Sequence, residues 1–418
     1  MDLMLAKSKT KIVYRLLRLV GCFFLIGESP AAIPQEIHGI EPNRAPTPGL
    51  STEDIESGWL SLFDGESLFG WRVESEANWE IDRGIIRVSS GEPGLLRTTT
   101  QFDHFDLRLE FRAPANTNSG VFIHTSPNPS DPTVDCYEVN IARADISPFP
   151  TGSIVGRHRA SNFDLNTEQW SLMRIVAEEA RIRCWVNGEL VSDYRDERAQ
   201  GPLGKGYIGL QFNAGRVEFR NLRLLPLSLQ PIPLSKDLAA WNTDLTMESE
   251  FSVTDQGELQ IRGGRGQLES NGLYADFIFS MQCRTNAEGL NSGIFFRSIP
   301  GELMNGYESQ IQNQFHDNDR RRPVDCGTGG IFRRSEARFV NADDNQWFTK
   351  TIIADGPHVA VWVNGYQVTD WSDRRQPDAN PRRGLRREAG SIIIQGHDPT
   401  TDILMRSMMI RSMESRNR

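Results

Sequence analysis

The sequence predicts an all-β protein that contains two tandem copies of one sandwich or jelly-roll domain. Apolar and polar residues alternate in short runs such as 84–88 (GIIRV), 105–111 (FDLRLEF) and 183–186 (RCWV), and Gly, Asn, Asp and Pro separate these runs. Alternation with a period of two is typical of half-buried strands, and many short strands joined by turns favour a sandwich or jelly roll. No stretch has a helical period of useful length.

A set of motifs recurs in the same order in the two halves of the chain. Residues 118–122 (NSGVF) and 137–141 (YEVNI) return as 291–295 (NSGIF) and 307–311 (YESQI). A tryptophan, a Trp-Val-Asn-Gly segment and a glutamine follow in each copy: Trp170, 185–188 and Gln211 in the first, and Trp347, 362–365 and Gln395 in the second. An offset of about 170 to 185 residues fits a whole domain and is too long for a solenoid repeat. A chain of 418 residues has room for two such domains.

These patterns divide the chain into five segments. Prolines and a lack of periodicity favour one linker before the first copy and another between the copies. The predicted segments are a signal peptide (1–32), a linker (33–57), the first jelly-roll domain (58–228), a short linker (229–234) and the second jelly-roll domain (235–414).

The N-terminus has the residue order of a secretory signal. Basic residues precede an apolar run at 19–26, and small residues follow it. This order predicts export to the periplasm or the cell exterior. The run is shorter than the roughly 20 residues that span a bilayer, so we expect no transmembrane span in the mature chain, although an uncleaved N-terminal anchor stays an alternative. Lipid attachment at Cys22 is disfavoured, because Arg18 interrupts the sequence before it and the apolar run continues past it.

Composition limits the ligands that the protein can take. The net charge is −9 and the isoelectric point is near 5.4, with the basic residues scattered, which argues against nucleic acid as a partner and favours a neutral or polar ligand. The four cysteines after Cys22 have no spacing typical of zinc and differ in position between the copies, so a shared disulfide framework is disfavoured relative to buried thiols. No cofactor is expected. A divalent cation at 316–319 (HDND) is an alternative to a solvated loop, but that segment lacks the length of an EF-hand.

Two short motifs have structural interpretations. Asn-Gly in each Trp-Val-Asn-Gly segment tolerates positive φ and predicts a tight hairpin, beside which Trp185 and Trp362 pack in the core or, as the alternative, stack on sugars. The Asn-Ser-Gly segments at 118–120 and 291–293 predict turns in which Gly supplies a positive φ.

The strands at 137–141 and 307–311 carry the candidate reactive residues. Alternation places Tyr137 on an apolar face and sends Glu138 and Asn140 to the opposite face; Glu308 and Gln310 occupy the same positions in the second copy. A carboxylate beside an amide can hydrogen-bond sugar hydroxyls, and the carboxylate can also transfer a proton. The alternative is a solvated outer face, and retention in both copies favours the ligand face.

Other candidate residues differ between the copies. After the Asn-Ser-Gly strand, His124 in the first copy could act as an acid or base, whereas Arg297 in the second could only bind or stabilise charge. The second copy also places His397 beside Asp398 just after Gln395.

These motifs together resemble those of the domain of unknown function 1080, also called the 3-keto-disaccharide hydrolase domain. The opening segment 62–71 (LFDGESLFGW), the Asn-Ser-Gly and Tyr-Glu strands, the Asn-Gly hairpin and the closing segment 219–222 (FRNL) resemble the motifs of the family. The resemblance covers nearly the whole mature chain, once per copy. It implies concanavalin-like jelly rolls that act on glycosides already oxidised at the third sugar carbon by a separate oxidoreductase.

The resemblance also implies a chemistry. A ketone at C3 acidifies the C2 proton, so that a base can remove this proton while an acid helps to expel the group at C1, after which water adds back. Such a site needs a base, an acid and a group that stabilises the enolate.

Carried over by position, the resemblance implies roles for ten residues. In the second copy Glu308 would be the base or acid, with His397 and Asp398 as partners and Gln310, Arg297 and Gln395 binding the sugar; in the first copy Glu138, Asn140, His124 and Gln211 occupy the corresponding places. The chain departs from the family where Arg143 and Asn313 replace an acidic residue after the Tyr-Glu strand, and where Asn140 replaces the usual Gln. We therefore expect catalysis in the second copy, with the first as a binding module. The rival hypotheses are a carbohydrate-binding protein without catalysis and a scaffold protein.

Overall fold

The computed structural model describes residues 49–161, 166–167, 169–198, 201–243 and 246–413. The predicted signal peptide, Cys22 and most of the first predicted linker lie outside these ranges. In the described part of the chain, no helix is both long enough and apolar enough to cross a membrane.

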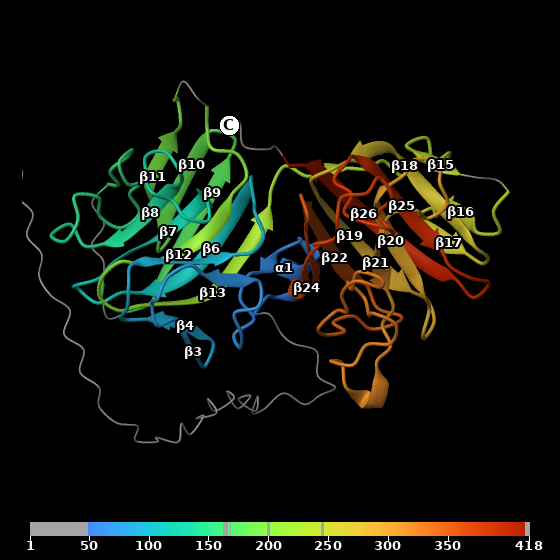
Figure 1. Cartoon of the computed structure of the whole chain (residues 1–418), viewed down its shortest axis with the longest axis horizontal. Helices are drawn as coiled ribbons and strands as arrows, with labels where there is room; N and C mark the ends of the chain where they lie inside the picture. The colour runs from blue at the N-terminus through green and yellow to red at the C-terminus, as the bar shows by residue number, and fades with distance from the viewer. Residues whose placement is uncertain (1–48, 162–165, 168, 199–200, 244–245, 414–418) are drawn as a thin grey trace, which may run out of the picture. The chain divides into compact units, whose positions relative to one another are not determined.

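The first copy folds as a sandwich of two antiparallel sheets, drawn in blue to green in Figure 1. The larger sheet has the order β11-β10-β9-β6-β13-β4-β3, with β1 paired to β13, and the smaller sheet has the order β2-β5-β12-β7-β8. The larger sheet contains β1 (Leu60–Ser61), β3 (Glu80–Asp82), β4 (Ile85–Val88), β6 (Phe105–Arg112), β9 (Ser171–Glu178), β10 (Arg181–Val186), β11 (Glu189–Arg195) and β13 (Val217–Pro226). The smaller contains β2 (Trp71–Val73), β5 (Gly94–Thr98), β7 (Asn118–Thr125), β8 (Tyr137–Ala142) and β12 (Tyr207–Phe212).

The second copy repeats this architecture. Its larger sheet has the order β16-β17-β26-β19-β22-β23-β24, with β14 paired to β26, and its smaller sheet has the order β15-β18-β25-β20-β21. The larger sheet contains β14 (Gln230–Pro231), β16 (Glu250–Val253), β17 (Leu259–Arg262), β19 (Phe277–Thr285), β22 (Phe348–Asp355), β23 (His358–Val363), β24 (Tyr366–Ser372) and β26 (Asp402–Ser412). The smaller contains β15 (Trp241–Thr243), β18 (Gly266–Tyr274), β20 (Ser292–Ser298), β21 (Tyr307–Ile311) and β25 (Gly390–Gly396). The predicted fold class, two tandem all-β jelly-roll sandwiches, is confirmed.

The predicted alternation explains the cores. In β6, Phe105, Leu107, Leu109 and Phe111 are fully buried, while Arg108 and Glu110 between them are partly exposed. Every second side chain of a strand thus packs in the space between the two sheets, and the side chains between them face outward.

Two predicted linkers contain regular structure. Helix α1 (Thr52–Glu56) lies within the predicted linker 33–57. The helix begins here because Ser51 and Asp54 form a capping box that satisfies the first backbone amides. Asp54 also pairs with Arg223 at 2.9 Å. Between the copies, β14 pairs with β26. The described parts of both linkers therefore belong to the folded unit.

The Trp-Val-Asn-Gly hairpins form as predicted. In both turns Asn and Gly have positive φ, 50° and 86° in the first copy and 48° and 71° in the second. Trp362 is 1% exposed and donates its indole N–H to the backbone oxygen of Ser61 at 3.0 Å, so it is a core residue and does not stack on a ligand. Trp185 is half-buried, with the guanidinium of Arg174 4.8 Å from its ring centre.

The cysteines and the HDND segment have structural roles. The four described cysteines are buried free thiols. In the HDND segment, which contains the short 3-10 helix η1 (His316–Asn318), Asp317 pairs with Arg322 and Asp319 with Arg321. Across the described residues, no group of three or more His, Cys, Asp or Glu side chains could hold a metal ion.

Candidate functional site

Glu308 lies on the outward face of the smaller second sheet, as the alternation predicted. Its neighbour Tyr307 is 4% exposed and packs in the core against Phe296, with ring centres 5.4 Å apart. Strand pairing sets Glu308 opposite Phe295 and Phe295 opposite Ile393, so these three side chains form one row across the sheet.

The outward face is covered and is not a solvated surface. Gln310, two residues after Glu308, is only 1% exposed, and Gln395 on the same face is 7% exposed. Loops that follow β21 and β24 contribute covering residues, including Phe332 and Pro381. The alternative of a solvated face is therefore wrong for this sheet.

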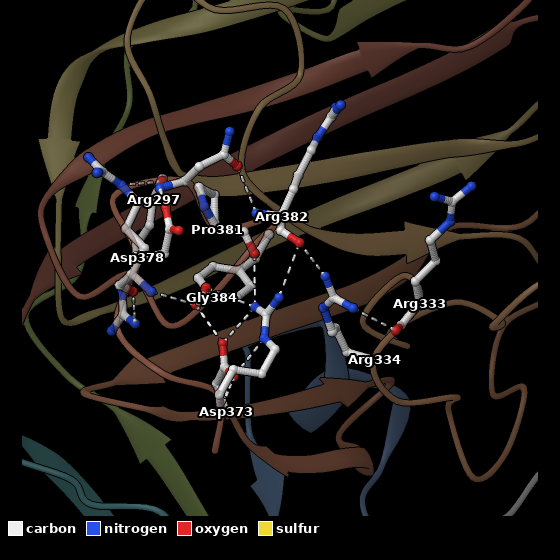
Figure 2. Close-up of polar contacts among 12 residues, drawn as sticks. Arg297, Arg333, Arg334, Asp373, Asp378, Pro381, Arg382 and Gly384 are labelled. Carbon is white, nitrogen blue, oxygen red and sulfur yellow. Dashed lines mark hydrogen bonds and ion pairs between the residues drawn. The ribbon is translucent and has the colours of Figure 1, made fainter.

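A cavity of about 250 Å³ adjoins Glu308. Phe295, Phe332 and Pro381 give it apolar walls, and Arg333, Arg334 and Arg382 bring three guanidinium groups to it. Figure 2 shows the three arginines, with Arg334 next to the backbone of Arg333 and of Arg382. An apolar recess with a few convergent polar groups is the usual form of a small-ligand site.

Glu308 has the properties of a proton-transfer group. Burial, and then the negative charge of Asp325, raise its pKa to about 7, while Lys350, Arg382 and Arg333 oppose the shift. Among the described residues, no side chain hydrogen-bonds to its carboxyl group, which therefore stays available to a ligand. A carboxyl group with a pKa near the working pH can accept a proton and return it.

Gly293 allows the Glu308 carboxyl group to lie over β20. Gly293 is opposite Gln310 and Phe295 is opposite Glu308, so Glu308 is the diagonal neighbour of Gly293 on the same face of the sheet. A Cβ atom added at Gly293 would lie 2.6 Å from Glu308 Oε1 and 2.9 Å from its Cγ. Gly120 has the same relation to Glu138, with 3.1 Å to Cγ.

This geometry corrects the predicted role of the Asn-Ser-Gly segments. Both lie within or at the start of strands β7 and β20, and neither Gly120 nor Gly293 has a positive φ. Glycine is needed there because the glutamate of the neighbouring strand occupies the space that a side chain would fill.

We expect Gly293→Ala to lower turnover at this site about 100-fold, because the added methyl group displaces the flexible Glu308 side chain by about 1 Å or more. The free energy of unfolding should change little, since the clash is relieved by moving the end of one side chain. Steady-state kinetics and thermal denaturation of the same preparation measure the two effects. Gly120→Ala is the matched control in the first copy and should leave turnover unchanged; unchanged turnover in Gly293→Ala as well would show that the position of Glu308 is unimportant.

Asp325 is a site residue that the sequence analysis missed. The Gln310 side-chain amide donates to Asn291 Oδ1 at 2.8 Å and to Asp325 Oδ2 at 2.9 Å, so Gln310 holds Asp325 near Glu308. Asn313, which replaces the acidic residue of the family pattern, instead bonds Asp344 at 3.0 Å. An acidic residue from a later loop thus lies beside the Tyr-Glu strand, and no local spacing rule would have found it.

A tyrosine anchors the strand that carries the glutamate in both copies, β21 and β8, through an Asp–Arg pair; we call this arrangement the tyrosine clamp. Tyr307 donates its hydroxyl to Asp373 at 2.8 Å, and Arg375 pairs with Asp373 at 2.7 Å. In the first copy Tyr137 bonds Asp196, which pairs with Arg198 at 2.6 Å. Burial raises the pKa of both tyrosines to about 12, so they stay protonated donors. The signal in the sequence was an Asp-x-Arg motif at the same distance after each Trp-Val-Asn-Gly segment.

Arg297 and His124 do not join the site, contrary to the prediction. Both have positive φ, 47° and 49°, which breaks the alternation and turns the side chains inward. Arg297 is 1% exposed and donates to the backbone oxygens of Ala275 at 2.7 Å and Gly356 at 2.6 Å. His124 is 4% exposed, and its Nδ1 lies 2.6 Å from the Gly204 oxygen. Buried groups with these partners cannot reach a sugar.

His397 and Asp398 form a pair away from Glu308. His397 Nδ1 lies 2.8 Å from Asp398 Oδ2, and bonds from Thr400 and His397 lower the pKa of Asp398 to about 2. The register of β20 and β25 sets His397 about four residues, or roughly 13 Å, along the sheet from the row of Glu308. The prediction that this pair assists Glu308 is not supported by the geometry.

The remaining predicted residues are Gln395 in the second copy and Glu138, Asn140 and Gln211 in the first copy. Gln395 lies on the Glu308 face, with its amide nitrogen 3.4 Å from Met304 Sδ. Burial raises the pKa of Glu138 to about 7, and a hydrogen bond from Gln211 opposes the shift. Glu138 is 7% exposed and Asn140 is 2% exposed, with the Asn140 amide donating to Ser147 and Phe149. The first glutamate is therefore more enclosed than the second.

Both copies match the same protein family. Residues 58–225 and 232–411 match the model of the 3-keto-alpha-glucoside-1,2-lyase-like domain. The chain belongs to this family. This match to the 3-keto-alpha-glucoside-1,2-lyase-like family confirms the resemblance that was drawn from the sequence.

Individual relatives are more distant. A 3-keto-disaccharide hydrolase of Bacteroides thetaiotaomicron is 22% identical over 225 residues, which cover 40% of this chain and 78% of that protein. Among solved structures, a provisionally assigned glycosyl hydrolase of Parabacteroides distasonis is 18% identical and covers 44% of this chain and 100% of its own, with a TM-score of 0.38. The carbohydrate binding module CBM66 of Bacillus subtilis is 16% identical and covers 41% and 96%, with a TM-score of 0.31.

Proposed function

We propose that the second sandwich cleaves the glycosidic bond of 3-keto-glycosides in the cavity beside Glu308. The observation that carries this proposal is the Glu308 carboxyl group, which is free of protein hydrogen bonds in the described chain and has a pKa raised to about 7. The family and the Bacteroides relative support a reaction at a glycoside. The lower exposure of Glu138 argues against catalysis in the first copy.

The proposed reaction is an elimination followed by hydration. The Glu308 carboxylate takes the C2 proton, and the electrons of the C2–H bond enter the enolate of the 3-ketone. The enolate then forms the C1–C2 double bond as the C1–O bond breaks, and the carboxylic acid of Glu308 returns its proton to the leaving oxygen. Water adds across the double bond, with hydroxide at C1 and a proton at C2. Arg382, whose guanidinium lines the cavity and is held by the Met304 oxygen, would stabilise the enolate.

This reaction needs a substrate that another enzyme has oxidised. We propose that a 3-keto-forming oxidoreductase supplies it, and that the segment predicted as a signal peptide exports the chain to the same compartment. No cofactor is required by the steps above.

The test compares 3-keto-glycosides with their unoxidised parents as substrates of the wild-type protein. We expect turnover of the keto compounds only, with solvent deuterium incorporated at C2 of the product. Turnover of the unoxidised parents at a similar rate would contradict the elimination route. Sugar binding without turnover of any compound would instead favour a carbohydrate-binding protein.

A further inference from the structure

The arginines of the Glu308 cavity lack the carboxylate partners that neighbouring arginines have. Arg375 pairs with Asp373 at 2.7 Å, and Arg383 pairs with Asp378 at 3.0 Å. Within the described part of the chain, no ion pair involves Arg333, Arg334 or Arg382. Three arginines without a carboxylate partner therefore line a small cavity whose lining contains one carboxyl group, that of Glu308.

Each of the three groups has a contact within the protein. Arg334 donates to the backbone oxygens of Arg333 at 3.2 Å and Arg382 at 2.9 Å, as Figure 2 shows. The Arg333 guanidinium lies 5.1 Å from the ring centre of Phe332. Burial, and then the nearby charge of Arg375, lowers the pKa of Arg334, which fits a cation without enough compensating negative charge.

The surplus charge is specific to the second copy. The bridge between Ile331 and Ser335 corresponds to the bridge between Ile154 and His158, so that Gly156 stands where the second copy has Arg333. Arg157 stands where the second copy has Arg334, but Arg157 pairs with Asp196 at 3.6 Å, so its charge is compensated. The whole chain has a net charge of −9, so a basic cavity does not follow from the general composition. With Glu308 ionised and a neutral sugar bound, the lining carries three positive charges and one negative charge, so two positive charges stay unbalanced.

We propose that Arg333 and Arg334 bind an anionic substituent, a carboxylate or a sulfate, on the sugar substrate of this site. Guanidinium groups pair with both anions through two parallel hydrogen bonds. The inference rests on the proposed function for the sugar substrate, and it adds that the preferred substrate is an acidic sugar such as a uronide or a sulfated glycoside.

The test is calorimetric titration with methyl glucoside, methyl glucuronide and methyl glucoside 6-sulfate. We expect the wild-type protein to bind at least one anionic sugar about 10-fold to 100-fold more tightly than the neutral sugar, because each charge-assisted hydrogen bond contributes about 1.5 to 3 kcal/mol. The anion that binds more tightly identifies the substituent. Arg333→Gln and Arg334→Gln should each remove most of this preference, which is the ratio of the affinities for the anionic and the neutral sugar measured on the same variant.

Arg383→Gln is the matched control, since it removes an equal charge from the same region where the arginine is already paired. It should keep the preference. Equal binding of the three sugars, equal loss in Arg383→Gln, or inorganic sulfate binding as tightly as the sulfated sugar would each overturn the inference. Because Arg333 is exposed, Arg333→Gln should fold normally, and circular dichroism checks this. The titration measures binding and does not depend on turnover. A protein that prefers the anionic sugar but turns over no substrate would therefore contradict the proposed reaction and leave this inference standing.

Discussion

Glu308→Gln is expected to lower kcat/KM for 3-keto-glycosides by about 10²-fold to 10⁴-fold, the usual range for loss of a general acid–base. The amide has nearly the same size as the carboxyl group but cannot accept the C2 proton. Sugar binding should persist, because the cavity walls and arginines are unchanged. Steady-state kinetics, with calorimetric binding on the same preparation, measure both quantities.

Glu138→Gln is the control for this substitution, since it makes the same change on the equivalent strand of the first copy. It should keep nearly full turnover; a loss in Glu138→Gln alone would move the chemistry to the first sandwich. The pH profile gives a second readout. Since Glu308 acts first as a base, kcat/KM should rise as pH passes through about 7 and then level, following the pKa of Glu308.

Lys350→Met is expected to remove a steep rise in stability with pH. Lys350 of β22 is 0% exposed and donates across the sandwich to the backbone oxygens of Ser309 and Gln310 at 2.8 Å each, on the strand that carries Glu308. Burial lowers its pKa from 10.5 to about 7, while Cys283, Cys326 and Glu308 act in the opposite direction. The first copy has a buried methionine, Met173, three residues after the shared tryptophan where the second has this lysine.

The unfolded chain keeps the lysine proton up to about pH 10.5, whereas the folded chain loses it near pH 7. Unfolding between these pH values takes up a proton, so the free energy of unfolding rises with pH by up to about 1.4 kcal/mol per unit, or about 2 kcal/mol from pH 7 to 9, since half of the folded chains still hold the proton at pH 7. The difference between wild type and Lys350→Met, measured by urea denaturation across this range, should show this slope. Lys236→Met, which changes an exposed lysine, should behave as wild type. Parallel curves for wild type and Lys350→Met would show that Lys350 keeps its proton in the fold.

Much of the fold could be predicted because it depends on local patterns. Alternation identified strands such as β6, the Asn-Gly pairs identified both hairpins, and the recurring motifs identified two domains. The same alternation placed Glu308 and its neighbour Tyr307 on opposite faces of their strand. It failed at Arg297 and His124, because one residue with positive φ reverses the direction of the side chain without a clear signal in the sequence.

The sequence by itself determined the repeat, the strand pattern and the face on which Glu308 lies, since a period of two within one strand fixes these features. Only the tertiary structure decided what surrounds that carboxyl group. Asp325, Arg333 and Arg382 reach it from loops distant in the chain, and Gly293 and Lys350 reach it from other strands. The raised pKa and the surplus positive charge of the cavity follow from burial and charge proximity, which depend on how distant segments pack and not on residue order.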